Sequence, residues 1–250
     1  MFHTLESEYQ AWKSRPLGER DEYLFADGTY FTVIYEGAGC KMPILVVLGI
    51  TPAGEREVLG FTVGDRENQQ AWEGVFEDLK RRGLKEVGLL ITDGHQALLN
   101  ALAAKFPGVP RQRCVKHKME NVLGYLPKKQ RDGVGAEVKA IFYQASREDA
   151  EQLAYAWCEK YRRDYPSAVE CLWRDLEACL TFYSFPPEHG KAIRTTNAIE
   201  RLIAEVKKRY HKMSAAFRNE DSCRLMFYAV VRGVKFQRLT RPLGQQQREN

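Results

Sequence analysis

The sequence contains no run of apolar residues long enough to cross a membrane. Its longest apolar runs, residues 42–50 and 87–92, have the length of strands, whereas a membrane helix needs roughly 18 or more such residues. The first eight residues are polar and acidic, without the basic flank and apolar core of a signal peptide. We therefore expect a cytoplasmic protein with no membrane partner.

Several sequence patterns that define common sites are also missing. The six cysteines follow no framework spacing and include no Cys-x-x-Cys pair, which predicts free thiols. Cys114 and His117 have the spacing of half a zinc site, but no second pair completes it, so zinc is not expected. The sequence has no glycine-rich phosphate loop, Gly-x-Ser-x-Gly or Ser-x-x-Lys. Nucleotide triphosphate hydrolysis and serine chemistry are therefore unsupported.

The composition is that of a globular protein with an uneven distribution of charge. The chain has 250 residues, of which 44% are hydrophobic and 28% charged. This is enough for one large core, or for one core with a sizeable insertion. The net charge is +5, but residues 191–241 contain thirteen Lys or Arg and only four Asp or Glu. This basic segment favours a polyanionic partner.

Hydrophobic periodicity predicts strands first and then alternating helices and strands. Residues 1–20 have the pattern of an amphipathic helix that ends at Pro16. The segments that follow are strands at 23–35, 42–50 and 57–64, a helix at 69–82, a strand at 87–92, a helix at 96–106 and a short strand and helix within 109–126. The first three strands form an antiparallel meander. The order β-β-β-α-β-α-β-α predicts an α/β fold with a mixed, ribonuclease-H-like sheet, in which the first and fourth strands are neighbours.

Residues 127–185 contain only helical patterns, and prolines stand at both edges of this segment. We interpret it as an all-helical insertion into a core formed by residues 1–126 and 186–250. Two further helices are predicted at 196–210 and 221–238, and the polar tail at 245–250 is expected to be loose.

Three carboxylates are the candidates for chemistry: Asp27 in a strand pattern, Asp93 directly after an apolar strand, and Glu200 on a helix. Acidic residues at strand ends and on a helix face can converge to bind two metal ions. Two such ions clamp the attacking and leaving oxygens of a phosphodiester. The interpretation is a phosphoryl-transfer site that acts on a DNA or RNA backbone.

Each carboxylate also has a structural alternative. Asp27 and the following glycine are typical of a hairpin turn, and Asp93 has the position of a helix cap. Glu200 can complete a capping box with Asn197. However, Glu200 lies on the flank of the stripe formed by Ile199, Ile203, Val206 and Tyr210, where it can face a cleft while the helix stays packed.

The motifs of the chain, in order, resemble those of the IS256/Mutator-type DDE transposases. The matching segments include Thr92-Asp93-Gly94-His95 and Gln112-Arg113-Cys114-Val115-Lys116-His117-Lys118. Others lie at residues 23–30, 57–61, 79–84, 106–108, 182–186 and 194–200. Together they extend over nearly the whole chain.

The resemblance implies a ribonuclease-H-like catalytic core in which Asp27, Asp93 and Glu200 bind two Mg²⁺ ions, with Mn²⁺ as a substitute. It implies that water attacks the phosphodiester at the end of the transposon and that the freed 3′-hydroxyl then attacks target DNA. The expected partners are transposon ends, target DNA and further copies of the chain on paired ends. Residues expected to orient or contact DNA are Cys114, His117, Arg194, Arg201, Lys207, Lys208 and Arg209.

Members of this family carry a DNA-binding region ahead of the first Asp, whereas 26 residues precede Asp27 here. The expectation is therefore a catalytic core or a truncated reading frame. Two alternatives stay open: a ribonuclease-H-like nuclease that cuts without joining strands, and a non-catalytic remnant that binds DNA or regulates a full-length transposase.

Overall fold

The structure is a computed structural model that describes residues 2–35, 37–212 and 217–239. It divides into two compact units. Unit 1 comprises Met1–Leu90, His95–Val109 and Asn197–Asn250, and unit 2 comprises Ile91–Gly94 and Pro110–Thr196. The predicted loose tail at 245–250 lies outside the described residues.

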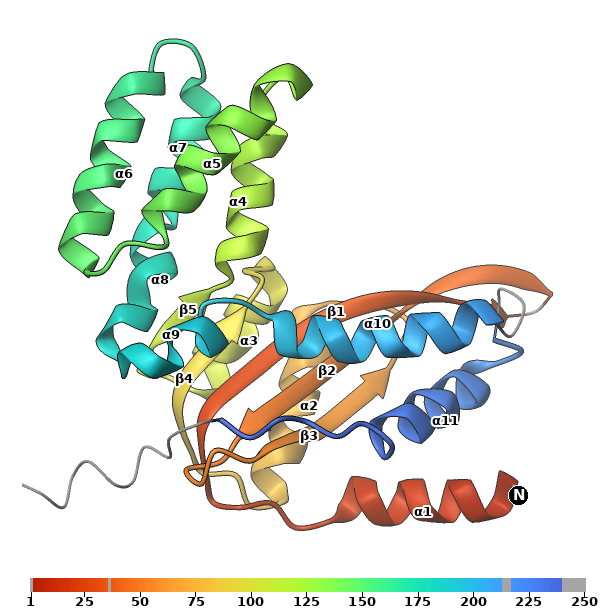
Figure 1. The fold of residues 1–250 in the computed structure, drawn as a ribbon. Coiled ribbons are helices and arrows are strands. Elements are labelled where there is room, and N and C mark those ends of the chain that lie inside the picture. The colour runs from red at the N-terminus through yellow and green to blue at the C-terminus, as the bar shows by residue number, and fades with distance from the viewer. Residues whose placement is uncertain (1, 36, 213–216, 240–250) are drawn as a thin grey trace, which may run out of the picture. The chain divides into compact units, whose positions relative to one another are not determined.

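The strands form one mixed five-stranded sheet in the order β3-β2-β1-β4-β5 (Figure 1). They are β1 (Arg20–Tyr35), β2 (Ala38–Ile50), β3 (Arg56–Val63), β4 (Glu86–Thr92) and β5 (Arg111–Arg113). The first three strands pair antiparallel, as the meander predicts. The first and fourth strands are neighbours, which confirms the prediction made from the order of the elements.

Strands β1 and β4 run parallel and begin at the same level. The backbone N–H of Glu86 donates to the carbonyl oxygen of Glu19 at 2.9 Å, and Arg20 forms an ion pair with Glu86 at 3.3 Å. Two residues beyond Arg20 and Glu86 on their strands, a Cβ added to Gly88 would lie 2.7 Å from the carbonyl oxygen of Glu22. Equal steps along both strands therefore keep them in register through unit 1.

Two strands are longer than the sequence pattern indicates. β1 begins at Arg20 rather than residue 23, and β2 begins at Ala38 rather than residue 42. The added residues are polar or exposed and lack the apolar alternation on which the prediction was based. Pairing with residues 32–35 of β1 holds residues 38–41 in the sheet, and residues 20–22 lie beside the start of β4.

Helices cover both faces of the sheet in unit 1 (Figure 1). On one face, α2 (Gln69–Arg81) and α3 (Gln96–Lys105) pack on alternate strand residues that include Leu24, Ala26 and Val47. On the other face, α10 (Asn197–Lys212) contacts β1 and β2, and α11 (Glu220–Val231) contacts β3. Because successive side chains of a strand point to opposite faces, Asp27 points away from Ala26 and toward the α10 side.

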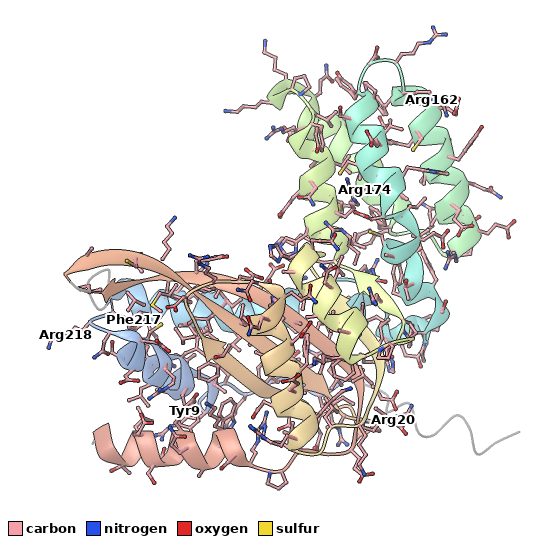
Figure 2. The ribbon with its side chains drawn as sticks, turned by 180° about the vertical axis from the view of Figure 1, so that it is seen from behind. Tyr9, Arg20, Arg162, Arg174, Phe217 and Arg218 are labelled. Atoms are coloured by element: carbon pink, nitrogen blue, oxygen red, sulfur yellow. The ribbon has the colours of Figure 1, made fainter. Side chains whose placement is uncertain are left out.

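Helix α1 (Phe2–Ser14) packs on α11 through aromatic side chains. Tyr9, labelled in Figure 2, lies 5.7 Å from Phe61 and 5.5 Å from Tyr228 between ring centroids. The helix ends at Ser14, ahead of the Pro16 predicted to stop it. Helix α11 also ends earlier than predicted, at Val231 rather than residue 238, because its last buried residue is followed by Arg232 and Gly233.

Unit 2 contains β5 and a set of helices around a core of its own. The helices are α4 (Val115–Gly124), α5 (Arg131–Ile141), α6 (Arg147–Tyr161), α7 (Pro166–Arg174), α8 (Leu176–Leu180) and α9 (Pro187–Ile193), with 3-10 turns at Lys128–Gln130 and Thr181–Ser184. The core includes Val122, Val138, Trp157 and Leu172. The segment 127–185 thus contains helices only, as its sequence pattern predicts.

All six cysteines are free thiols, as predicted from their spacing. Among the residues that the structure describes, no helix combines the length and apolar character that a bilayer crossing requires.

The core of unit 2 holds a fully buried lysine. The Lys118 ammonium donates to the carbonyl oxygen of Cys171 and to Asp175 Oδ2, each at 2.5 Å. Arg113 Nε lies 3.4 Å from the same carboxylate oxygen. Burial raises the pKa of Asp175, but the hydrogen bond and charge of Lys118 and the charge of Arg113 outweigh it and leave that pKa below its ordinary value. The carboxylate therefore compensates two cations in a poorly solvated place.

We expect Asp175→Ala to lower the free energy of unfolding by about 3 kcal/mol, because it leaves the buried Lys118 ammonium without its counter-charge. A carboxylate with a lowered pKa stabilises the fold at neutral pH and loses that effect as the pH falls through its folded pKa. The difference in free energy of unfolding between Asp175→Ala and wild type should therefore become smaller at low pH. Urea denaturation at several pH values measures it. The control is Glu177→Ala, which removes an exposed pair with Arg147 and should change stability by about 0.5 kcal/mol or less.

A second buried acid, Asp21 on β1, lacks such compensation. Burial and the charges of Glu57 and Glu22 raise its pKa from 3.8 to about 7. The folded state then holds a proton that the unfolded state releases above about pH 4, so stability falls as the pH rises from about 4 to 7. We expect Asp21→Asn to stabilise the chain little at pH 4 and by up to about 4 kcal/mol at pH 8. Parallel denaturation curves for Glu55→Gln, an exposed acid, should follow wild type at both values.

Candidate active site

Asp27 lies in the middle of β1, opposite Val46 of β2. Its exposed fraction is only 6%. The pairing continues on both sides without interruption, so the hairpin-turn interpretation of Asp27 is wrong. A buried Asp inside a strand is unfavourable for the sheet itself, which makes Asp27 a candidate for function.

Asp93 directly follows β4, which ends at Thr92. The next helix, α3, begins at Gln96 with His95 as its N-cap residue. Asp93 is therefore not the N-cap of this helix, and that alternative interpretation is wrong. Gly94 has a φ of +83°, a left-handed conformation that favours glycine, and a Cβ at this position would overlap the Arg113 guanidinium. The turn after β4 thus packs tightly against Arg113 within unit 2.

Glu200 lies in the first turn of α10 and is half-buried. The buried residues of this helix include Ile199, Ile203 and Val206. Glu200 stands beside this stripe, as the helical periodicity predicts. Because α10 packs on β1, Asp27 and Glu200 belong to elements that are in contact within unit 1.

The three carboxylates are divided between the units: Asp27 and Glu200 belong to unit 1, and Asp93 belongs to unit 2. Asp93 is three residues beyond Leu90, the last residue of β4 in unit 1. Asp27 lies five residues beyond Glu22, and Asp93 lies five residues beyond Gly88. Both acids therefore lie the same number of residues along the chain beyond the contact between Glu22 and Gly88.

Cys114 and His117 are joined through Thr196 in unit 2. Cys114 Sγ accepts hydrogen bonds from the backbone N–H and the hydroxyl of Thr196, each at 3.3 Å. The Thr196 hydroxyl also lies 3.5 Å from His117 Nδ1. Burial raises the pKa of the Cys114 thiol, but hydrogen bonds from His117 and Thr196 outweigh it and lower that pKa below its ordinary value. This arrangement fixes the start of α4 and stabilises a thiolate.

The basic residues expected to contact DNA fall into two groups. Arg201, Lys207, Lys208 and Arg209 are exposed on α10, where Lys208 pairs with Glu205 at 2.6 Å. Arg194 is held within unit 2 instead. Its guanidinium lies 4.2 Å from the ring centroid of Tyr143 and donates to the carbonyl oxygen of Phe142 at 3.0 Å.

The structure adds Glu67, which the sequence analysis did not single out. Its side chain is 8% exposed and accepts hydrogen bonds from Trp72 Nε1 at 3.3 Å and the Tyr30 hydroxyl at 3.2 Å. A Cβ on Gly28 would lie 2.6 Å from Glu67 Oε1, so the carboxylate rests on the backbone next to Asp27. His95 Nδ1 is 3.6 Å from the same oxygen. The sequence offers no signal for this role, because Glu67 precedes a helix in a polar segment.

The chain matches the family model described as "Transposase, Mutator family" over residues 1–238. It is 37% identical over 229 residues to the transposase for insertion sequence element IS406 of Burkholderia multivorans, a match that covers 91% of this chain and 58% of the relative. It is 31% identical over 232 residues to the transposase for IS256 in transposon Tn4001 of Staphylococcus aureus, with 91% and 58% covered. The chain belongs to the Mutator family of transposases, which confirms the resemblance, and it spans somewhat more than half the length of these relatives.

Among solved structures, a cryo-electron microscopy structure of a simian T-cell lymphotropic virus intasome in complex with PP2A regulatory subunit B56 gamma is a weak match. The TM-score is 0.28 at 13% identity, over 53% of this chain and 52% of the other.

We expect Cys114→Ala to lower the free energy of unfolding by about 1–3 kcal/mol, because it removes the buried sulfur that accepts two hydrogen bonds from Thr196. Chemical denaturation measures this difference. The matched control is Cys40→Ala, at an exposed position of β2, where the change should stay within about 0.5 kcal/mol. Equal stability of both variants would contradict a structural role for the Cys114–Thr196 contact.

Proposed function

We propose that this chain carries the catalytic core of an insertion-sequence transposase, with Asp27, Asp93 and Glu200 as its catalytic acids. In the first step, water attacks the phosphodiester at the element end and the leaving oxygen departs as a 3′-hydroxyl. In the second step, this hydroxyl attacks a phosphodiester of target DNA and joins the strands. Membership of the Mutator family supports DNA as the substrate.

The observation that carries the proposal is the parallel pairing of β1 with β4. Acids at equivalent steps of neighbouring parallel strands lie at the same edge of a sheet, which is where ligands bind in α/β proteins. The contact of α10 with β1 supports Glu200 as the third member of the set. A ribonuclease-H-like core formed by residues 1–126 and 186–250, with residues 127–185 inserted, is part of this proposal.

The donor set suits a hard divalent cation. Asp27, Asp93 and Glu200 would supply carboxylate oxygens, the ligands that Mg²⁺ and Mn²⁺ prefer. Two such ions would supply activation of the nucleophile and neutralisation of the charge on the leaving oxygen. The position of Asp27 inside a paired strand supports this assignment, because a rigid element holds a ligand oxygen in a fixed place.

The exposed basic side chains of α10 are proposed to contact DNA phosphates: Arg201, Lys207, Lys208 and Arg209. Cys114, His117 and Arg194 hold contacts within unit 2, so we propose that they act on DNA by shaping the surface that meets it. Assembly of several copies on paired ends is also part of the proposal.

We expect isothermal titration calorimetry with Mn²⁺ to detect binding to the wild-type chain, and Asp27→Asn, Asp93→Asn and Glu200→Gln each to weaken it at least tenfold through loss of a charged ligand. The control is Glu205→Gln, which changes an acid on the same helix that pairs with Lys208 and should leave binding unchanged. Unaltered affinity in all three site variants would remove the metal assignment.

The same variants separate chemistry from DNA binding. The substrate is a labelled duplex made from the DNA that borders the coding region, supplied with Mg²⁺ or with a chelator. Wild type should cut one strand and join the 3′ end to a second duplex, and the three site variants should bind this DNA but not cut it. Cleavage without joining would indicate a nuclease, and binding without cleavage by wild type would indicate a regulator.

A further inference from the structure

Arg56, the first residue of β3, is a half-buried cation that the proposed mechanism does not yet use. Its neighbour Glu57 forms an ion pair with Arg15 at 3.0 Å, and within the described part of the chain no other carboxylate pairs with Arg56. Of its guanidinium nitrogens only Nε is both buried and without a hydrogen-bond partner, so the terminal nitrogens remain open to a ligand. A cation withdrawn from water without a counter-charge is unfavourable for the fold, and such residues concentrate at functional sites.

The side chain of Arg56 points to the face of the sheet that α10 covers. Arg56 pairs with Ile50, the last residue of β2. Ile50 is four residues from Val46, which lies opposite Asp27 on β1. Because alternate residues of a strand share a face and paired residues point the same way, Arg56 stands on the same side of the sheet as Asp27. This is the side on which α10 contacts β2.

Arg201 of α10 brings a second positive charge to Arg56, and both residues belong to unit 1. Burial, and in addition the charge of Arg201, lower the pKa of Arg56 below its ordinary value. The two guanidinium groups therefore repel each other. Arg201 is exposed, and it has no carboxylate partner among the residues that the structure describes. Two cations held near each other without a counter-charge attract an anion.

The turn that leads into Arg56 is fixed by hydrogen bonds. The Thr51 N–H donates to the carbonyl oxygen of Glu55 at 2.9 Å, and the Leu239 N–H donates to the carbonyl oxygen of Gly54 at 2.8 Å. Gly54 has a φ of +80°, and a Cβ at this position would lie 2.8 Å from the carbonyl oxygen of Leu239. The backbone that carries Arg56 is therefore in place before an anion arrives, which reduces the cost of ordering on binding.

We propose that Arg56 and Arg201 together bind one phosphate of the DNA backbone. The phosphate supplies the negative charge that both side chains lack, and it accepts the hydrogen bonds that a guanidinium donates in a planar fork. This inference deepens the proposed function and rests on it, because it takes DNA as the source of the phosphate. Arg201 directly follows Glu200 in the chain. Arg56 thus adds a contact from the sheet to the basic residues of α10.

The first test does not depend on activity or on DNA. Arg56→Met keeps most of the apolar stem and removes the uncompensated charge, so we expect the urea midpoint of unfolding to rise. The control is Arg66→Met, at an exposed position beyond the other end of β3, which should leave the midpoint unchanged. A lower midpoint for Arg56→Met would show that Arg56 stabilises the fold and would overturn the proposal.

The second test measures the affinity for a fluorescent DNA duplex, in the presence of a chelator so that the DNA stays intact. We expect Arg56→Met to weaken binding about tenfold and to reduce the salt dependence of the affinity. Arg56→Lys keeps the charge but not the fork, and should recover part of the affinity. Arg66→Met should bind within about twofold of wild type. Wild-type affinity in Arg56→Met would contradict the assignment.

A double-mutant cycle tests whether the two arginines hold the same phosphate. Arg56→Met and Arg201→Met should each weaken DNA binding about tenfold, and the double variant should lose clearly less than the product of about 100-fold, because residues that share a partner are coupled. Losses that multiply would assign the two side chains to separate phosphates and overturn the shared site.

Unfolding in the presence of each ligand separates DNA from a free ion. The duplex should raise the urea midpoint of wild type more than that of Arg56→Met, because a ligand stabilises the state that binds it. Inorganic phosphate at the same ionic strength should raise both midpoints equally, through its general effect on protein surfaces. A larger effect on wild type with inorganic phosphate alone would assign the site to a free phosphate ion and exclude the DNA backbone.

The outcomes distinguish this inference from the proposed function. If Asp27→Asn still cuts DNA, the proposed function fails. If Asp27→Asn is inactive while Arg56→Met binds the duplex as wild type does, the function stands and only the phosphate site at Arg56 is lost.

Discussion

The parallel pairing of β1 with β4 is the constraint on which the rest of the site depends. β1 is the central strand, held by β2 on one side and by β4 on the other. A slip of one residue in either register would turn Asp27 from the α10 face to the face covered by α2 and α3. The apolar alternation on both faces prevents such a slip, because it would also expose Leu24 and Ala26. Core packing thus decides where Asp27 points.

The chain contains several buried charges, and their environments separate structural from functional roles. Lys118 and Asp175 compensate each other inside unit 2, so their burial is explained without any ligand. Asp21 is buried near two other acids, and its raised pKa shows the energetic cost. Asp27 is equally buried in the strand it shares with Asp21. Residues that are unfavourable for the local structure concentrate at functional sites. Asp27, unlike Asp21, is followed by Gly28, whose missing side chain leaves room for the Glu67 carboxylate.

Much of the fold follows from the sequence because its information is local. Apolar alternation and helical periodicity predict the meander, the alternating helices and strands, and the neighbouring positions of the first and fourth strands. Local patterns were insufficient at the ends of elements: β1 starts with polar residues that only pairing retains, and α11 stops seven residues before its predicted end. Glu67 and Arg113 could not be found either, because their roles depend on Gly28 and Gly94, which are distant in the sequence.

Helix α10 combines three requirements of the proposed site in one element. Its buried stripe, including Ile199 and Val206, fixes the helix on the sheet, and Glu200 stands at the edge of that stripe. On the outward side, Arg201 directly follows Glu200, and Lys207, Lys208 and Arg209 stand about two turns further along the helix. Phosphates attracted to these residues would lie close to Glu200, and the cations offset the repulsion between a polyanion and the acids that must approach it. A helix with a buried stripe, Glu200 at the edge of that stripe and basic residues on its outward side can therefore bind the DNA backbone and supply a metal ligand without changing its packing.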